Sequence, residues 1–455
     1  MTKKFYYPLF TTLFLGAALF LASSCEGPAG PAGKDGVSGV DGLAGLAGKD
    51  ANENCKKCHT PAVVEAKATQ YELSKHSFGE TAKAEAGGST GCTPCHESEA
   101  FKFVCANNTP ATFVKNSTTG KFSNSYVATV TTGFGEFTCN TCHSSLHKTY
   151  EVADFYPLTT TAAVPMTMWA GAKTINLTQD DGKSNLCVKC HQPRPITRLF
   201  DGNVVDYASL ATAGPTDIAY SSTNTAKDSV GMNLVTPSYR THVHYGAVGA
   251  IVAGVGGVEF GTGYLSSKHA TVASCVDCHM ADMTNAAGGH SFVAKGNFNG
   301  CNVSGCHSDA PISSSSASWT TTRNSTKALL NSLATKLIIG GIEILNKNPD
   351  ATANLWAGLT AGNYDGYLNV YDPINNPTAV INNGGAAKQF KNMGNTSSWN
   401  SDQITYNNTL TPIFLTKIQL GAIINFQLCL RESSLGIHNT KYSTALLTNS
   451  IAALP

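Results

Sequence analysis

The feature that most constrains this chain is a short motif of cysteine and histidine that recurs along its first three hundred residues. The pattern Cys-x-x-Cys-His occurs five times, and a sixth copy has four residues between its cysteines. The six copies span residues 55–59, 92–96, 139–143, 187–191, 275–279 and 301–307. They use twelve of the fifteen cysteines and leave Cys25, Cys105 and Cys429. Any fold for this chain must therefore place six pairs of thiols, each with a histidine directly after the second thiol.

The order of residues in this motif is that of a haem-attachment signal. The two thiols can add to the vinyl groups of a haem, and the adjacent histidine then ligates the iron. We therefore predict six covalently attached haems c. The thioether cysteines would be Cys55, Cys58, Cys92, Cys95, Cys139, Cys142, Cys187, Cys190, Cys275, Cys278, Cys301 and Cys306. The proximal iron ligands would be His59, His96, His143, His191, His279 and His307.

Three other interpretations use the same cysteines. A zinc site would take Cys-x-x-Cys pairs two at a time, and a disulfide scaffold would suit an exported chain, but neither needs a histidine after every second cysteine. A thioredoxin-like redox site uses one such pair beside a βαβ unit rather than six pairs. The wider spacing of Cys301 and Cys306 is the weakest attachment signal, and a disulfide is the alternative there.

The supply of other histidines decides what can bind the opposite face of each iron. Thirteen histidines less the six of the motifs leave seven, one more than six irons need. The distal candidates are His76, His147, His242 or His244, His269, His290 and His438. His147 follows His143 by four residues and would share its helical face, so it would serve a neighbouring haem rather than that of His143.

The first fifty residues predict export and anchoring. Lys3 and Lys4 precede an apolar run at 9–21, which is short for a membrane span and typical of a signal peptide at residues 1–24. The sequence LASSC resembles a bacterial lipoprotein signal, so we expect lipidation of Cys25; a soluble exported protein is the alternative. Glycine at every third position of residues 27–48 predicts a collagen-like stalk at 25–51, either a flexible spacer or a trimerising triple helix.

The rest of the chain divides by the position of the motifs. Residues 52–310 hold all six and predict a mainly α-helical cytochrome domain with long loops, in which porphyrin rings supply much of the buried apolar area. Residues 111–137 predict a hairpin insert. Residues 311–455 predict a C-terminal helical region, with helices at 324–346, 412–431 and 441–454 and a loop from 348 to about 402. The apolar stripes of these helices would face a core or, alternatively, an interface.

Several segments resemble multihaem cytochromes of the nitrite reductase and hydroxylamine oxidoreductase lineage. The matching runs, in chain order, are HYGAVGAIVAGVGGVEF, SSKHA, CVDCHM and GGHSF, with SLGIHNTKYSTALLTNSIAAL near the end. The resemblance covers residues 238–307 and 433–453 and implies distal-ligand roles for His244, His269, His290 and His438, with His244 preferred over His242. The chain lacks Cys-x-x-Cys-Lys, which marks the catalytic haem of pentahaem nitrite reductases. The resemblance therefore favours electron transfer over catalysis.

Together these features predict an exported, lipid-anchored hexahaem cytochrome of the periplasm, outer membrane or cell surface, which carries electrons through closely packed bis-histidine haems. No catalytic residue is predicted, and the alternatives are a haem-based oxidoreductase acting on a small nitrogen or sulfur oxyanion and an extracellular cytochrome filament subunit. We expect redox proteins or an extracellular acceptor as partners and leave a homo-oligomer open, whereas a net charge of +1 indicates no nucleic-acid partner. Arg194 and Arg198 would pair with haem propionates or lie in solvent, and a disulfide between Cys105 and Cys429 is left open.

Overall fold

The computed structural model describes the greater part of the chain after residue 58, and the chain from Asn52 to Pro455 forms one compact unit. The described segments are 59–77, 93–106, 112–115, 122–125, 135–144, 157–169, 171–194, 196, 207–214, 218–221, 241–347, 364–375, 377, 388–392 and 396–455. The predictions that lie outside these segments concern the signal peptide, Cys25, the glycine-rich stalk, the thiols Cys55, Cys58 and Cys92, and the side chains of His147 and Arg198.

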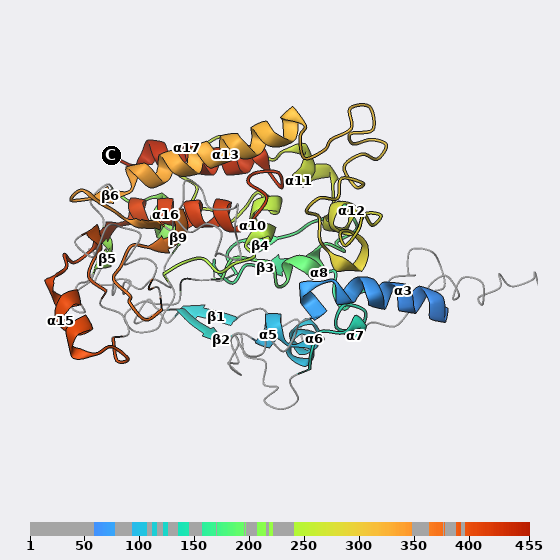
Figure 1. The fold of residues 1–455 in the computed structure, drawn as a ribbon, viewed down its shortest axis with the longest axis horizontal. Coiled ribbons are helices and arrows are strands. Elements are labelled where there is room, and N and C mark those ends of the chain that lie inside the picture. Colours follow the sequence, from blue (N-terminus) through green and yellow to red (C-terminus); the bar gives the residue numbers. More distant parts are fainter. Residues whose placement is uncertain are drawn as a thin grey trace, which may run out of the picture. The chain divides into compact units, whose positions relative to one another are not determined.

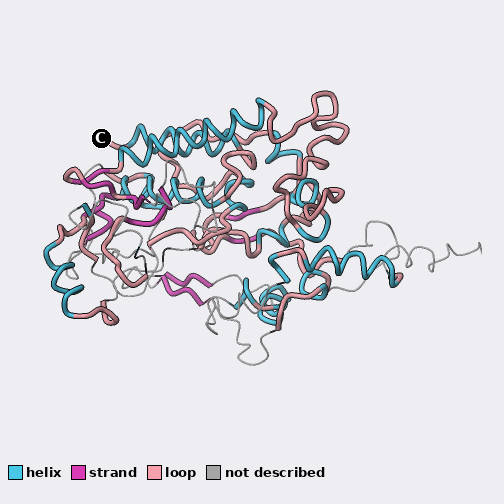
Figure 2. The backbone as a smooth tube through the Cα atoms, in the orientation of Figure 1, coloured by secondary structure: helices cyan, strands magenta, loops and turns pink. Residues whose placement is uncertain are grey.

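The fold is mainly helical with small sheets, and the helices that carry the cysteine motifs are short (Figures 1 and 2). These helices are α5 Thr93–His96, α7 Cys139–Cys142, α8 Asn185–Val188 and α12 Cys275–His279. The Ser274 hydroxyl accepts a hydrogen bond from the Asp277 amide, and the Asp277 carboxylate accepts one from the Ser274 amide. This capping box begins α12 at Cys275, so that both thiols and His279 share one short helix.

Loops connect the remaining elements of the region before residue 310. The described helices are α3 Pro61–Glu72, α6 Ser98–Ala106, α9 Ala208–Ala211, α10 Val248–Ala253 and α11 Lys268–Val272, with 3₁₀ turns η1 Lys75–Ser77 and η3 Gly289–Ser291. The described strands are β1 Thr112–Lys115, β2 Phe122–Ser125, β3 Val164–Pro165, β4 Thr174–Ile175 and β5 Ile218–Ser221. Strands β1 and β2 pair antiparallel, which confirms the hairpin predicted within residues 111–137, and β3 pairs antiparallel with β4.

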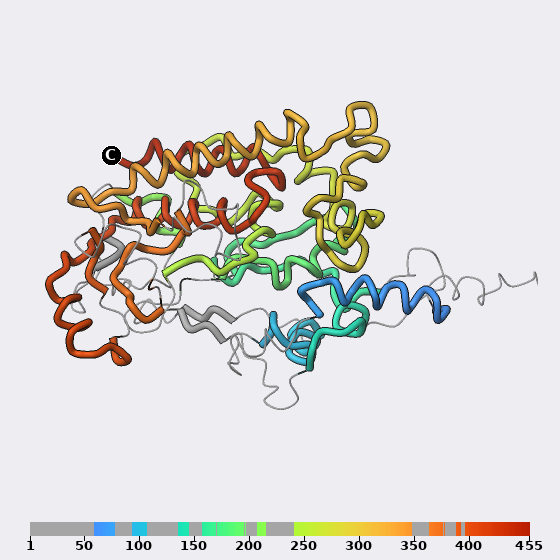
Figure 3. Tube along the Cα trace, viewed as in Figure 1, coloured from blue at the N-terminus to red at the C-terminus, as the bar shows by residue number. Residues whose placement is uncertain are grey.

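Three long helices form the C-terminal part of the fold: α13 Ala317–Lys336, α16 Lys417–Arg431 and α17 Thr440–Ala453. Helices α13 and α17 lie side by side, and α16 contacts both (Figures 1 and 3). The other elements are β6 Ile338–Ile339, β7 Ile342–Glu343, β8 Leu345–Lys347, β9 Tyr364–Leu368, α15 Ser401–Thr409 and β10 Phe414–Thr416. Among the described residues, no helix is long and apolar enough to cross a membrane.

The boundaries of two predicted C-terminal helices and of one predicted loop were wrong. The apolar run at 324–346 is not one helix, because α13 ends at Lys336 and Gly340 and Gly341, both at positive φ, turn the chain between β6 and β7. The predicted helix at 412–431 begins only at Lys417, after β10, where Thr416 caps it. The predicted loop from 348 to about 402 contains β9, which pairs with β8. The third helix, predicted at 441–454, is α17.

A buried amide joins α16 to two other parts of the core. The Asn425 side chain is fully buried; it accepts a hydrogen bond of 2.8 Å from the Val258 amide and donates one of 2.7 Å to the Val258 carbonyl. It also donates to the Ser450 hydroxyl of α17 at 2.9 Å. Since buried polar groups must be paired, this asparagine fixes the 258 segment and α17 against α16.

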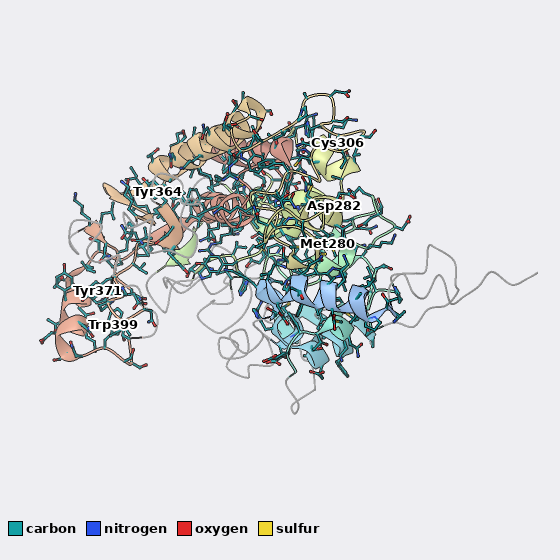
Figure 4. The ribbon with its side chains drawn as sticks, turned by 45° about the vertical axis from the view of Figure 1, so that its right-hand side comes forward. Met280, Asp282, Cys306, Tyr364, Tyr371 and Trp399 are labelled. Atoms are coloured by element: carbon teal, nitrogen blue, oxygen red, sulfur yellow. The ribbon has the colours of Figure 1, made fainter. Side chains whose placement is uncertain are left out.

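Buried apolar side chains are concentrated away from the later cysteine motifs. The main core uses residues from 164–260 and 330–454, and none of the described residues from 261 to 328 contributes a fully buried apolar side chain to it. A smaller core pairs Tyr371 with Trp399, with ring centroids 5.4 Å apart (Figure 4). Figure 4 also shows Met280, Asp282 and Cys306 in the region with few buried apolar side chains. The segment with two cysteine motifs therefore folds with little apolar core of its own.

Candidate haem-binding sites

Four of the predicted proximal histidines each face one of the predicted distal histidines. The pairs, with the distances between their ring centroids, are His191 with His76 at 5.9 Å, His96 with His244 at 6.2 Å, His307 with His269 at 6.0 Å and His279 with His438 at 6.2 Å. Each pair joins segments that are distant in the sequence. The chain thus brings a motif histidine and a histidine from elsewhere to nearly the same separation four times.

This separation fits one metal ion between two imidazoles. A ring nitrogen lies about 1.1 Å from its ring centroid, and a metal–imidazole bond is about 2.0 Å, so two rings on opposite sides of one ion have centroids about 6.2 Å apart. The observed distances of 5.9–6.2 Å match this value. The residues therefore fit axial ligation of a haem iron from both faces.

Backbone carbonyls set the tautomer of several of these rings. His244 Nδ1 donates to the Tyr245 carbonyl, His269 Nδ1 to the Ile437 carbonyl and His279 Nδ1 to the Phe292 carbonyl, each at 2.8 Å. Because a carbonyl oxygen only accepts, Nδ1 carries the proton and Nε2 keeps the lone pair that a metal needs. This second hydrogen bond is the usual partner of a metal-binding histidine.

Burial favours the neutral form of several of these imidazoles. It lowers the pKa of His191 to about 4, and the neighbouring histidines add to that effect. Burial likewise lowers the pKa of His244 to about 4 and outweighs the hydrogen bond to the Tyr245 carbonyl, which acts in the other direction. Neutral rings are the form that binds a metal, so burial suits His191 and His244 to that role, whereas the hydrogen bond with Glu432 outweighs burial and raises the pKa of His438.

The His279 and His438 pair differs because a carboxylate holds its distal member. Glu432 is buried, and its Oε2 lies 2.5 Å from His438 Nδ1. Ser434 Oγ and the Gly436 amide also donate to this carboxylate. Burial alone would raise the pKa of Glu432, but its hydrogen bond with His438 lowers it below its ordinary value. Glu432 is thus a carboxylate that fixes the His438 ring, which lies opposite that of His279.

The other two predicted sites are described in part. His143 Nδ1 lies 3.2 Å from the Pro157 carbonyl. Burial lowers the pKa of His290 to about 4, and the charges of Lys67 and His143 add to this, which puts His290 in the neighbourhood of His143. The His290 amide donates to Gln70 Oε1 of α3 at 3.1 Å. His59 precedes α3 and is exposed, while its motif thiols lie outside the described residues. His143 and His147 were predicted to share one face of a helix. His143 is not in a helix, because α7 ends at Cys142.

Thiols of different motifs lie near enough to interact. The interacting thiols are those of Cys95 with Cys190, Cys187 with Cys275 and Cys278 with Cys301. The motif of His191 therefore lies beside those of His96 and His279, and the motif of His279 lies beside that of His307. Electrostatic interaction between Cys142 and Cys187 also places the motif of His143 near that of His191.

Apolar side chains around the motifs are exposed. Leu265, Val272 and Val303 are 62%, 59% and 45% exposed, although they flank residues of two predicted sites. Burying such side chains is favourable by about 1.5–3 kcal/mol each. Their position agrees with the prediction that a large apolar group supplies part of the buried surface here.

Several functional candidates carried no signal in the sequence. Glu432 and Gly249 are examples: a Cβ at Gly249 would lie 2.6 Å from the His191 carbonyl, so only glycine lets α10 pack against this motif. Arg194, by contrast, was suggested by its charge and by its position just after His191, and it interacts electrostatically with His244 and with Cys95.

His242, Cys105 and Cys429 are not members of the ring pairs described above. His242 contacts Arg431 and stacks edge-on against Tyr367, with ring centroids 5.0 Å apart. Cys105 and Cys429 are both free thiols, so the disulfide left open for them is not formed. Cys429 is buried in α16 and directs its thiol to the Ser443 carbonyl.

Among the residues that the structure describes, no group of three or more His, Cys, Asp and Glu side chains is arranged to hold a metal ion by itself. Eight of the described histidines form pairs instead, which would leave a metal ion between two rings with four ligands to take from another source such as a porphyrin. Comparison of the chain with protein-family models, with curated proteins and with solved structures found no match.

Proposed function

We propose that this chain is an exported hexahaem c-type cytochrome that carries electrons through bis-histidine haems. The observation that carries the proposal is the set of four histidine pairs at 5.9–6.2 Å, each of which joins the histidine of a cysteine motif to a histidine outside the motifs. A haem in each site would supply an iron that exchanges one electron. The protein would supply covalent anchors through the thiols and both axial ligands.

Two neutral imidazoles are suited to this task. The same pair of rings can stay bound in both oxidation states, so little rearrangement accompanies the gain or loss of an electron. Hydrogen bonds from Nδ1 to backbone carbonyls hold the rings of His244, His269 and His279 in place. Fixed ligands and a fixed backbone favour rapid electron exchange over the binding of a substrate at the iron.

The interactions between thiols support an order for the electron path. They connect the motif of His96 to that of His191, then to that of His279 and then to that of His307. The motif of His143 lies near that of His191 as well, so the proposed path would branch at the haem of His191. In the proposed protein, electrons would pass between adjacent sites in this order.

The sequence supports the cellular setting of the proposal. The predicted lipidation of Cys25, together with the glycine-rich stalk, would attach the cytochrome to a membrane in the periplasm or at the cell surface. Redox proteins or an extracellular acceptor would then be its partners. The alternative of an oxidoreductase acting on a nitrogen or sulfur oxyanion requires an iron with one open face, and none of the four facing pairs provides one.

Two neighbouring histidines offer a matched test. We expect His244→Ala, in the matured full-length protein, to convert one of six haems to a high-spin form that binds carbon monoxide. His242→Ala should leave all six low-spin, because His242 faces Tyr367 and Arg431. Equal effects of the two substitutions on the spin state would contradict the proposed ligand pairs. A protein without covalent haem, with disulfides between the interacting thiols, would contradict the function itself.

A further inference from the structure

Arg431, the last residue of α16, is a buried cation among aromatic rings. Its side chain is almost fully buried, and its guanidinium carbon lies 4.5 Å from the centroid of Tyr245 and 5.1 Å from that of Tyr367. Its Nη1 donates to the Val243 carbonyl and contacts His242 Nδ1. One edge of the guanidinium is therefore fixed against the segment that leads directly into His244.

The opposite edge of the guanidinium has no hydrogen-bond partner among the described residues. Within the described part of the chain, neither Nε nor Nη2 of Arg431 has a hydrogen-bond partner, and both atoms are buried. These two nitrogens point their hydrogens in parallel on one side of the group, which is the fork that binds a carboxylate with two hydrogen bonds. A buried guanidinium without a counter-ion is strongly destabilising, so this edge calls for an anion.

The one carboxylate that interacts electrostatically with Arg431 among the described residues does not accept hydrogen bonds from Nε or Nη2. Asp365 interacts electrostatically with Arg431, but its own oxygens accept hydrogen bonds from the Asn346 side chain and the Tyr367 amide. Burial raises the pKa of Asp365 to about 6, against the lowering effects of those hydrogen bonds and of Arg431. Asp365 thus contributes to the surroundings of Arg431 without filling the two positions on Nε and Nη2.

We propose that the Nε and Nη2 edge of Arg431 binds a carboxylate, and that this carboxylate is a propionate of the haem ligated by His96 and His244. Arg431 acts electrostatically on His244 and holds the backbone at Val243, one residue before that ligand. A buried edge is more readily reached by a group that is attached during maturation than by a free ion from solution. This inference rests on the proposed function and adds a residue to it.

Arg431 would be a positioning residue with two effects. It would offset the negative charge of the propionate beside one iron, and it would tie the His244 segment to α16 and to the cofactor. Both effects concern one haem of the six. The change expected from its removal is therefore confined to a single site.

The test compares Arg431→Gln and Arg431→Lys with Arg323→Gln in the matured holoprotein. Arg323 stacks on Trp319 and donates to the Ser434 carbonyl, and so serves as the control arginine. We expect Arg431→Gln to lower the midpoint potential of one haem and to shift one propionate bending band in the resonance Raman spectrum. Arg431→Lys should keep the charge but not the fork, and should shift that band with a smaller change of potential. Arg323→Gln should do neither.

Three outcomes decide the inference. Six low-spin haems with no change of potential or propionate band in either Arg431 variant would overturn it while the proposed function stands. A wild-type protein that contains no covalent haem would instead overturn the proposed function. In a parallel titration, acetate or nitrite added to the oxidised wild-type protein should leave its spectrum unchanged. A saturable change that disappears in Arg431→Gln would overturn the propionate assignment in favour of a free oxyanion.

Discussion

Replacing Glu432 by glutamine tests the role of the carboxylate behind His438. The substitution keeps the shape of the side chain and its capacity to accept a hydrogen bond from His438 Nδ1, but removes a buried negative charge. Because that charge favours the ferric state of a haem bound by His438, we expect its removal to raise one midpoint potential. The other haems should keep their potentials, since Glu432 contacts no other histidine among the described residues.

The size of the shift follows from the geometry. The distance between Glu432 Oε2 and His438 Nδ1 is 2.5 Å. With about 2.2 Å across the ring and about 2.0 Å for an iron–nitrogen bond, the charge would lie about 6.7 Å from the iron. At an effective dielectric constant of about 20, one unit charge at this distance contributes about 2.5 kcal/mol. For one electron this free energy corresponds to a rise of about 110 mV.

The assay is a spectroelectrochemical titration of the holoprotein, with Glu259→Gln as the matched control. Glu259 pairs with Lys173 and accepts from the Tyr442 hydroxyl instead of contacting a histidine. We expect one of six potentials to rise in Glu432→Gln and none to rise comparably in Glu259→Gln. Unchanged potentials in Glu432→Gln, or a uniform shift of all six, would refute the reasoning.

Three further substitutions test other parts of the account. We expect His438→Met to keep that haem low-spin while raising its potential further than Glu432→Gln, because a thioether favours ferrous iron; an unchanged redox titration would count against this ligand. Asn425→Leu should lower the free energy of unfolding by about 2–4 kcal/mol in denaturant titrations, because both backbone groups of Val258 lose their partner. A loss no greater than for Asn449→Leu, which changes a half-buried asparagine that donates to one carbonyl, would be evidence against that link. Gly249→Ala should cost about 1–3 kcal/mol and broaden the low-spin signal of one haem, since its Cβ would meet the His191 carbonyl; wild-type stability and spectra would show that α10 can move aside.

The sequence allowed the composition of the candidate sites to be predicted, but not their pairing. A motif of five residues defines its own thiols and proximal histidine, because these neighbours must lie close together. Which distal histidine faces which motif depends on contacts between segments far apart in the chain, as with His96 and His244. The spacing of His242 and His244 was equally uninformative, and the buried contact of His242 with Arg431 distinguishes the two.

Some elements of the fold could also be predicted from the sequence, whereas the bounds of others could not. The helix at Thr440–Ala453 was found near its expected bounds, and the β1–β2 hairpin occupies the first part of the segment in which it was expected. The run at 324–346 misled because Leu and Ile suit both helices and strands, and Gly340 and Gly341 decide where the helix stops. Glu432 carried no signal because its role depends on a turn that brings it back to His438.

The most direct test of the central claim is quantitative electron paramagnetic resonance of the fully oxidised, matured protein. If each motif histidine shares an iron with a facing histidine, integration should give six low-spin ferric centres per chain. Spectra dominated by high-spin iron, or a chain with no iron signal, would contradict the claim.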